Sequence, residues 1–210
     1  MNQRKSMCVL STFVLCLMMM AFAVAGASAS QVTDASGQWK YVLKEGGATI
    51  TGYAKPLPSD LFIPNELDGH PVMSIRDRAF EDLNHINNVT IPDSVTSIGD
   101  SAFLRCSRLT SVTIPDSVTS IGMGAFYRCY SLTNITIPSG VTCIEPMTFY
   151  SCASLADVII PASVTRIGED AFKYCPNLTL TVMKGSFAEQ YAKDNDIPYF
   201  FTSDSSWLDN

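Results

Sequence analysis

Four segments of this 210-residue chain align without gaps at a fixed spacing of 23 residues. They begin at Asn88, Ser111, Asn134 and Asp157, and the second reads SVTIPDSVTSIGMGAFYRCYSLT. A period of this length is typical of repeat architectures, in which each unit packs only against its neighbours. The repeat therefore constrains the fold more strongly than any other feature of the sequence.

A fifth, divergent repeat precedes these four segments. Its Ile75 and Phe80 fall on two columns that recur every 23 residues, namely Ile98, Ile121, Ile144 and Ile167, and Phe103, Phe126, Phe149 and Phe172. This repeat carries five extra residues between Pro64 and Phe80, in the stretch 65–71. The insertion is the largest departure from the repeat pattern.

The apolar positions within one repeat follow neither the helical period nor a plain alternation. In the second segment they are Leu109, Val112, Ile114, Val118, Ile121 and Phe126. Burying six such side chains contributes about 9 to 18 kcal/mol, whereas ordering each backbone residue costs about 1 to 2 kcal/mol. One repeat cannot fold alone, so the spacing predicts an α/β-type or mainly β solenoid whose stacked strands form a parallel sheet.

The repeat consensus L-x-x-V-x-I-P-x-S-V-x-x-I-G-x-x-A-F-x-x-C resembles the leucine-rich repeat variant of BspA-like bacterial surface proteins, over about residues 39–201. The resemblance implies a short right-handed leucine-rich repeat superhelix that is exported and that binds or adheres without known catalysis. It implies no particular partner.

The N-terminus has the features of a secretory signal peptide. Basic Arg4 and Lys5 precede an apolar run over residues 7–25, and small residues suited to signal peptidase follow at 27–29. An uncleaved anchor is the alternative, because the run is long enough to span a membrane. We expect cleavage after residue 29, with the product secreted or held at the extracellular surface and no membrane insertion afterwards.

Both ends of the repeat array have the features of caps. Trp39, Tyr41 and Leu43 alternate toward a glycine reversal, which predicts a β-hairpin. Ser186 and Glu189 form a capping box before a short helix, and a strand-like stretch follows at 197–201. The predicted organisation is a signal peptide (1–29), an N-terminal hairpin cap (30–62), a solenoid of five repeats (63–183), a helix–strand cap (184–201) and a flexible tail (202–210).

Proline follows the strand isoleucine in every repeat, so the chain should leave the sheet there and form a second extended piece at 118–121 and its equivalents. A glycine column comes next, but Glu145 and Arg76 occupy it in two repeats. We therefore expect this turn to require neither a positive φ nor glycine itself.

Four cysteines lie one repeat apart, at Cys106, Cys129, Cys152 and Cys175. Side chains in one solenoid column point in parallel, whereas a disulfide needs Cβ atoms about 3.8 Å apart, so we predict buried free thiols. A disulfide or a metal site is the alternative. Cys143 differs because its column is otherwise polar (Ser74, Ser97, Ser120 and Arg166). This predicts an exposed thiol that is reactive, forms an intermolecular bridge or is a neutral substitution.

Charge and motif content exclude several functions. Fourteen basic against 20 acidic residues give a net charge of −6, the wrong sign for nucleic acid or anionic lipid. His70 and His85 have no nucleophile or metal-ligand spacing, so we predict no enzyme activity, no metal and no cofactor. Arg105 and Arg128 share a column on the outer side and form at most a small basic spot.

The outward-pointing strand positions form a regular polar surface, which is the usual docking face of a solenoid. We name them the strand face and expect them to bind an extracellular protein or glycan: Asn88, Thr90, Ser111, Thr113, Asn134, Thr136, Asp157 and Ile159. Five strands span only about 20 Å, so single-site affinity should be modest.

The main alternative is a structural spacer or self-assembling surface protein with weak self-association and no soluble ligand. An enzyme or an ice-binding role is a third option, although Ile159 interrupts the threonine row that ice binding would need.

Overall fold

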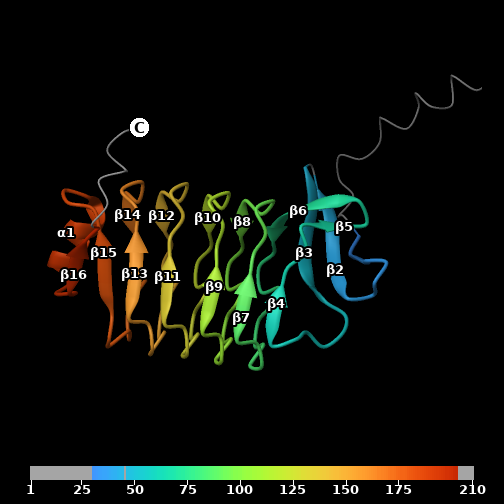
Figure 1. Ribbon diagram of the computed structural model, residues 1–210, viewed down its shortest axis with the longest axis horizontal. Helices are drawn as coiled ribbons and strands as arrows, with labels where there is room; N and C mark the ends of the chain where they lie inside the picture. Colours follow the sequence, from blue (N-terminus) through green and yellow to red (C-terminus); the bar gives the residue numbers. More distant parts are fainter. Residues whose placement is uncertain (1–29, 45, 203–210) are drawn as a thin grey trace, which may run out of the picture. The chain divides into compact units, whose positions relative to one another are not determined.

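The computed structural model describes residues 30–44 and 46–202, so the predicted signal peptide and nearly all of the predicted tail lie outside the described residues. The described strands and the helix belong to one compact unit that begins at Gln31. Figure 1 shows that this unit is a β-solenoid in which each repeat contributes one turn. The mainly β solenoid predicted from the repeat is therefore confirmed.

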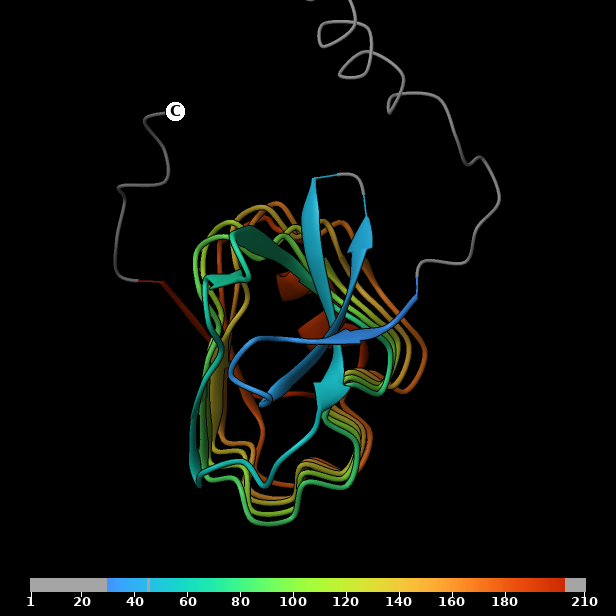
Figure 2. The same cartoon turned by 90° about the vertical axis from the view of Figure 1, so that its right-hand side faces the viewer.

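The chain enters the solenoid through antiparallel strands. The hairpin of β2 (Trp39–Lys44) and β3 (Gly47–Tyr53) is flanked by β1 (Val32–Thr33), and β3 pairs in parallel with β6 (His70–Ile75) of the first repeat. Figure 2 shows the end of β2 and the start of β3 projecting beyond the stacked turns. Tyr41 and Val42 are both buried whereas Leu43 is 43% exposed. The predicted alternation is therefore wrong at Leu43, because the strand is covered on both faces only up to Val42.

Two rows of parallel strands run through the repeats. The first row, which contains the predicted strand face, consists of β4 (Asp60–Phe62), β7 (Asn88–Thr90), β9 (Ser111–Thr113), β11 (Asn134–Thr136), β13 (Asp157–Ile160) and β15 (Thr179–Val182). The second row continues from β6 as β8 (Ser97–Ile98), β10 (Ser120–Ile121), β12 (Cys143–Ile144) and β14 (Arg166–Ile167). These second strands are shorter than predicted, because the residues before them form the turn in which Val118 N–H donates to the Pro115 carbonyl.

The five lattice phenylalanines form the centre of the core. Their rings stack along the solenoid, with centroids 5.2 Å apart for Phe80 and Phe103, 5.4 Å for Phe103 and Phe126, and 5.6 Å for Phe126 and Phe149. Phe172 continues the stack 5.4 Å beyond Phe149. Successive turns superpose when viewed along the stack (Figure 2), as the common axis inferred from the apolar spacing requires.

The glycine column is needed for close packing, which the sequence did not indicate. Gly99, Gly122 and Gly168 do not have positive φ angles, as predicted. A Cβ on Gly122, however, would lie 2.6 Å from the Asp100 nitrogen, and a Cβ on Gly168 would lie 2.4 Å from the Pro146 nitrogen. The prediction that glycine is dispensable here is therefore wrong, because this turn packs backbone against backbone.

Both strand rows are interrupted between the same two repeats. The first row divides between β9 and β11, and the second row divides between β10 and β12. Figure 1 shows the wider interval between β9 and β11. Glu145 occupies the glycine column at this junction, so a Cβ stands where Gly99, Gly122 and Gly168 carry only a hydrogen. We attribute the interruption to this substitution.

The helix–strand segment predicted at the C-terminus is present. Helix α1 (Phe187–Asp194) begins after Ser186, whose side chain accepts a hydrogen bond from Glu189 N–H at 3.2 Å, as in the predicted capping box. The Glu189 carboxylate accepts a hydrogen bond from Gly185 N–H, one residue before the position that a capping box uses. Ala188 and Ala192 are buried, and β16 (Tyr199–Phe201) pairs in parallel with β15.

The cysteine column forms a ladder of free thiols, as predicted. Each thiol donates a hydrogen bond to a phenylalanine carbonyl of the preceding repeat, with Sγ to O distances of 3.1 Å for Cys106 to Phe80 and 3.2 Å for Cys129 to Phe103. Cys106, Cys129 and Cys152 are fully buried, whereas Cys175 in the last repeat is half-buried. Burial raises the pKa of the Cys106 thiol to about 12 and that of Cys175 to about 11.

Candidate functional site

The strand face lies on one side of the first strand row because side chains alternate along each strand. Val89, Val112, Ile135 and Val158 point into the core, so the residues on either side of each point outward. Parallel pairing places equivalent residues next to each other, with Asn88 beside Ser111, Thr90 beside Thr113, Asn134 beside Asp157 and Thr136 beside Ile159. The structure thus brings all eight predicted residues to one surface.

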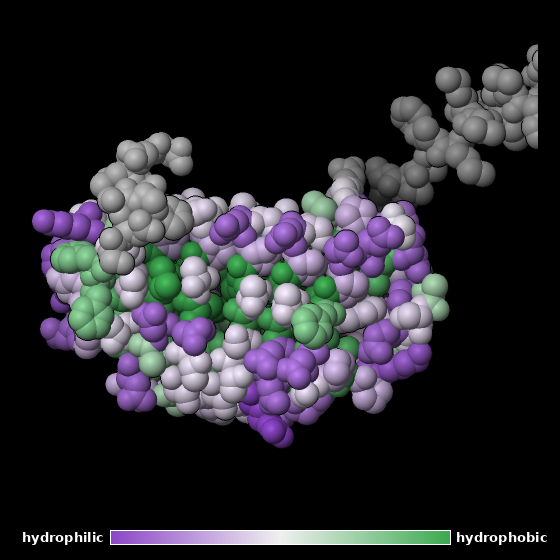
Figure 3. Space-filling model, viewed as in Figure 1, coloured by the Kyte–Doolittle hydropathy of each residue, from purple (hydrophilic) through white to green (hydrophobic). Residues whose placement is uncertain are grey.

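Most of these side chains are accessible. Asn88, Thr113, Asn134, Thr136 and Ile159 are exposed, and the other three members are half-buried. Figure 3 views this side and shows apolar surface along the strands, bordered by polar side chains. The surface therefore combines an apolar floor with polar groups.

The threonine hydroxyls of the strand face are free to bind a partner. Among the described residues, no hydrogen bond involves the side chains of Thr90, Thr113 or Thr136. The amide and carboxylate positions are more constrained, since Asn88 donates to Asp60 Oδ1 at 2.5 Å and Asp157 Oδ1 accepts from Thr181 at 2.9 Å. The threonine row thus offers free hydroxyls beside the hydrogen-bonded side chains of Asn88, Asn134 and Asp157.

The surface extends further than predicted, and an aromatic side chain lies at each end. Phe62 pairs with Thr90 on one side, and Phe200 pairs with Thr181 on the other. Both phenylalanines are 71% exposed. The sequence could have indicated Phe62, because this residue precedes an Ile-Pro pair just as Thr90 does. It could not have indicated Phe200, because β16 lies outside the 23-residue repeat.

The other residues singled out from the sequence do not form a site. Cys143 is half-buried, and its thiol pKa is raised by burial and by the neighbouring Glu145 carboxylate, so it is less reactive than the polar column suggested. His85 Nε2 lies 2.9 Å from the Leu57 carbonyl, and His70 is exposed. The described residues contain no cluster of side chains suited to hold a metal ion.

The two arginines of the outer column make only local contacts. Arg105 lies 3.9 Å from an Asp82 carboxylate oxygen, and the Arg128 guanidinium lies 5.2 Å from the centroid of the Tyr127 ring. Tyr127 in turn stacks on Tyr150 at 4.8 Å. These contacts occupy the outer turns, away from the strand face.

Comparison with known proteins identifies the family. The BspA type leucine rich repeat region matches residues 70–192 in six copies. The chain belongs to this family. The match counts one copy more than the five repeats recognised from the sequence. The structure also continues the first strand row one strand further, since β15 pairs with β13 in register.

Solved structures of bacterial leucine-rich repeat proteins share this fold. The leucine rich repeat protein of T. pallidum is 34% identical, with a TM-score of 0.66, and the match covers 71% of this chain and 70% of that one. A leucine rich cell surface protein of Faecalibacterium prausnitzii is 30% identical with a TM-score of 0.50, and the match covers 74% of this chain and 55% of that one. The pneumococcal vaccine antigen PcpA, 19% identical with a TM-score of 0.53 and coverage of 75% and 51%, shares the fold alone. No curated protein matches the chain.

These comparisons place the chain among bacterial leucine-rich repeat proteins. No helix among the described residues has the length and apolar character of a membrane span.

Proposed function

We propose that this protein is a secreted or surface-exposed binding or adhesion module that contacts an extracellular protein or glycan through the strand face. The observation that carries the proposal is the array of polar side chains that the core does not require, in register on either side of the division between β9 and β11. The β-strands hold these groups in place, so a partner binds without the entropic cost of ordering them. Family membership agrees with this role, since one relative is described as a cell surface protein.

The chemistry of the strand face suits a polar, extended partner. Its hydroxyl and amide groups both donate and accept hydrogen bonds, and Ile159, Phe62 and Phe200 add apolar contacts. The strand face offers less area than the roughly 800 Å² that each partner buries in a standard interface. Single contacts are therefore weak, and clustering of the protein on a surface raises the apparent affinity through effective concentration.

The double variant Thr113→Arg with Thr136→Arg tests the proposal. Two long cationic side chains on the strand face should abolish binding without lowering the melting temperature, because Thr113 and Thr136 are exposed in the free protein. A pull-down against extracellular matrix and cell-envelope material identifies the partner. Binding is then measured with each protein both monomeric and clustered on beads.

The matched control is Arg105→Gln with Arg128→Gln on the outer turns, which should bind as the wild type does. Normal binding by the strand-face variant, together with lost binding by the control, would place the site on the outer turns and refute the proposal. Concentration-dependent self-association with no captured ligand would instead support the structural-spacer alternative.

A further inference from the structure

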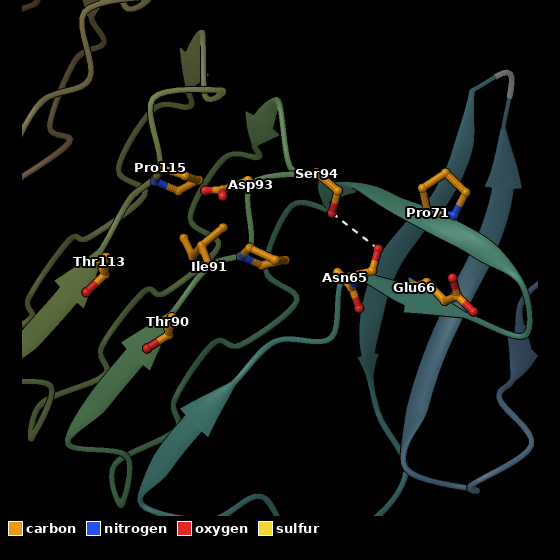
Figure 4. A pocket seen from close by; sticks show the side chains of 10 residues that line it. Asn65, Glu66, Pro71, Thr90, Ile91, Asp93, Ser94, Thr113 and Pro115 are labelled. Carbon is orange, nitrogen blue, oxygen red and sulfur yellow. Dashed lines mark hydrogen bonds between the residues drawn. The ribbon is translucent and has the colours of Figure 1, made fainter.

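The five extra residues of the first repeat build one wall of a hollow. They form a small antiparallel ladder in which Glu66 and Leu67 of β5 (Glu66–Leu67) pair with Pro71 and His70 of β6. This ladder stands beside the proline turns that follow β7 and β9, and a hollow of about 620 Å³ lies between them. Figure 4 shows the hollow and the hydrogen bond, 3.2 Å long, from Ser94 Oγ to the Asn65 carbonyl, which ties the wall to the next repeat.

The hollow has an apolar floor and an acidic rim. Ile91 is only 2% exposed and lies at the bottom, with Pro71 and Pro115 at the sides. Asp93 lies beside Pro115, whereas Glu66 lies on the opposite wall (Figure 4). Both carboxylates are exposed, and neither takes part in an ion pair among the described residues.

Charge is distributed unevenly around the solenoid. No lysine or arginine occurs in residues 56–75, 86–98, 109–121, 132–144 and 155–165, which hold the first-row strands β4, β7, β9, β11 and β13 and the proline turns after them. These segments carry six carboxylates: Asp60, Glu66, Asp68, Asp93, Asp116 and Asp157. The basic residues of the repeats all lie elsewhere, at Arg76, Arg78, Arg105, Arg108, Arg128, Arg166 and Lys173. The strand side, defined by the first strand row and the proline turns after it, is therefore acidic, whereas the second row carries Arg166 in β14.

We propose that the hollow receives a lysine or arginine side chain from an extended basic segment of a partner protein. Such a side chain places its apolar stem against hydrophobic surface while its charged head stays at a polar rim, which matches the Ile91 and proline floor below Glu66 and Asp93. The inference rests on the proposed function, because the hollow opens onto the strand face through Thr90 and Thr113. The rest of the basic segment then lies along the strand face.

A synthetic peptide tests this assignment. The probe is a fluorescein-labelled dodecapeptide of alternating lysine and serine, titrated with the purified protein at 50 mM NaCl and followed by fluorescence anisotropy. The variant Glu66→Gln with Asp93→Asn keeps the shape of the hollow but removes both charges. Because exposed ion pairs are individually weak and this variant removes two of them, we expect the peptide to bind about fivefold more weakly.

The matched control Glu169→Gln with Asp196→Asn removes the same charge from exposed positions outside the strand side, and its affinity should stay within about twofold of wild type. Added salt should weaken binding to the wild type more than binding to the hollow variant. The proposal is refuted if both variants bind alike. It is also refuted if a glutamate–serine peptide binds as well as the lysine peptide, or if a neutral oligosaccharide competes without any salt dependence.

The two proposals fail in different ways. If Thr113→Arg with Thr136→Arg loses the pulled-down partner while the hollow variant retains both the partner and the peptide, the strand-face function stands and the cation assignment fails. If the partner binds normally to the strand-face variant, the proposed function fails, and the peptide titration then reports on the hollow alone.

Discussion

At the scale of single residues, the cysteine column shows how the repeat keeps a reactive group inert. A thiol reacts as the thiolate, so a cysteine that stays protonated and covered resists oxidation. Cys106, Cys129 and Cys152 meet both conditions, because burial raises the pKa of each thiol and its proton is donated to a carbonyl of the preceding repeat. These side chains act as small apolar fillers that also satisfy a backbone acceptor.

The raised thiol pKa values predict a loss of stability at alkaline pH. The folded-state pKa is about 12 for Cys106 and about 11 for Cys175, against an ordinary value of 9.0. Above pH 9 the unfolded chain loses protons that the folded chain retains, so the free energy of unfolding falls as the pH rises toward 11 to 12. The limiting slope is about 1.4 kcal/mol per pH unit for each such thiol, and below pH 9 these thiols contribute no pH dependence.

Urea unfolding at a series of pH values between 8 and 11 measures this slope. Tyr191 shares the direction, since burial raises its pKa as well, so the diagnostic quantity is the difference between wild type and Cys106→Ala. The variant should lose stability at every pH but show a shallower decline above pH 9. Identical slopes for the two proteins would mean that Cys106 ionises as readily in the folded state as in the unfolded state.

At the scale of the structural element, the turn after each second strand is set by how closely two backbones approach. Gly122 packs on Gly99 and Asp100 of the preceding repeat, and an added Cβ would lie 2.6 Å from the Gly99 carbonyl carbon. Backbone atoms cannot move aside as a flexible side chain can. The whole turn has to shift when the glycine is replaced.

Replacing Gly122 with alanine should therefore destabilise the protein by about 1 to 3 kcal/mol, the usual cost of overpacking. Gly140→Ala is the control, because an added Cβ there would approach Thr119 Cγ2 at 3.1 Å, a side-chain atom that can yield. Urea unfolding of both variants gives the comparison. Equal and small losses would show that the turn has room for a side chain and that another cause must explain the interruption at Glu145.

How far the sequence predicts this structure follows from the same elements. The columns of Ile98 and Phe103 determine the strands, the core and the alternation that exposes the strand face, because a fixed period leaves one way to stack the units. The steric need for glycine was missed because Glu145 in the same column suggested tolerance, and only the stacked backbones reveal the cost. The insertion before Phe80 was recognised, but its role as the wall of a hollow depends on where the next repeat lies.

At the scale of the whole solenoid, stability is a sum over repeats and the interfaces between them. The interface between the repeats that begin at Ser111 and Asn134 is the one where both strand rows divide. The outer turns stay joined there, since Phe126 N–H donates to the Thr148 carbonyl at 2.9 Å and Arg128 N–H donates to the Tyr150 carbonyl at 2.8 Å. Next to the strands, Thr133 N–H donates to the Thr110 carbonyl at 3.2 Å, but β9 and β11 do not pair, and neither do β10 and β12. This junction therefore has fewer hydrogen bonds along the strands than along the outer turns.

A junction with fewer hydrogen bonds is where a repeat array separates into cooperative units. We predict two such units in hydrogen exchange measured by mass spectrometry, one up to residue 133 and one from residue 134. The second should open at the lower free energy, because it is shorter and lacks the N-terminal hairpin that pairs with the first repeat.

Glu145→Gly restores the glycine column and so should let β10 and β12 approach as β8 and β10 do. Exchange from residues 134–144 should slow in this variant, and the two opening free energies should converge even though the substitution removes the exposed ion pair with Arg166, 2.9 Å long. Glu145→Gln separates the two effects, because it removes the charge but keeps the Cβ and should leave the two units distinct. A single opening free energy throughout the wild-type solenoid would contradict the prediction. The interruption of both strand rows at this junction would then not affect stability.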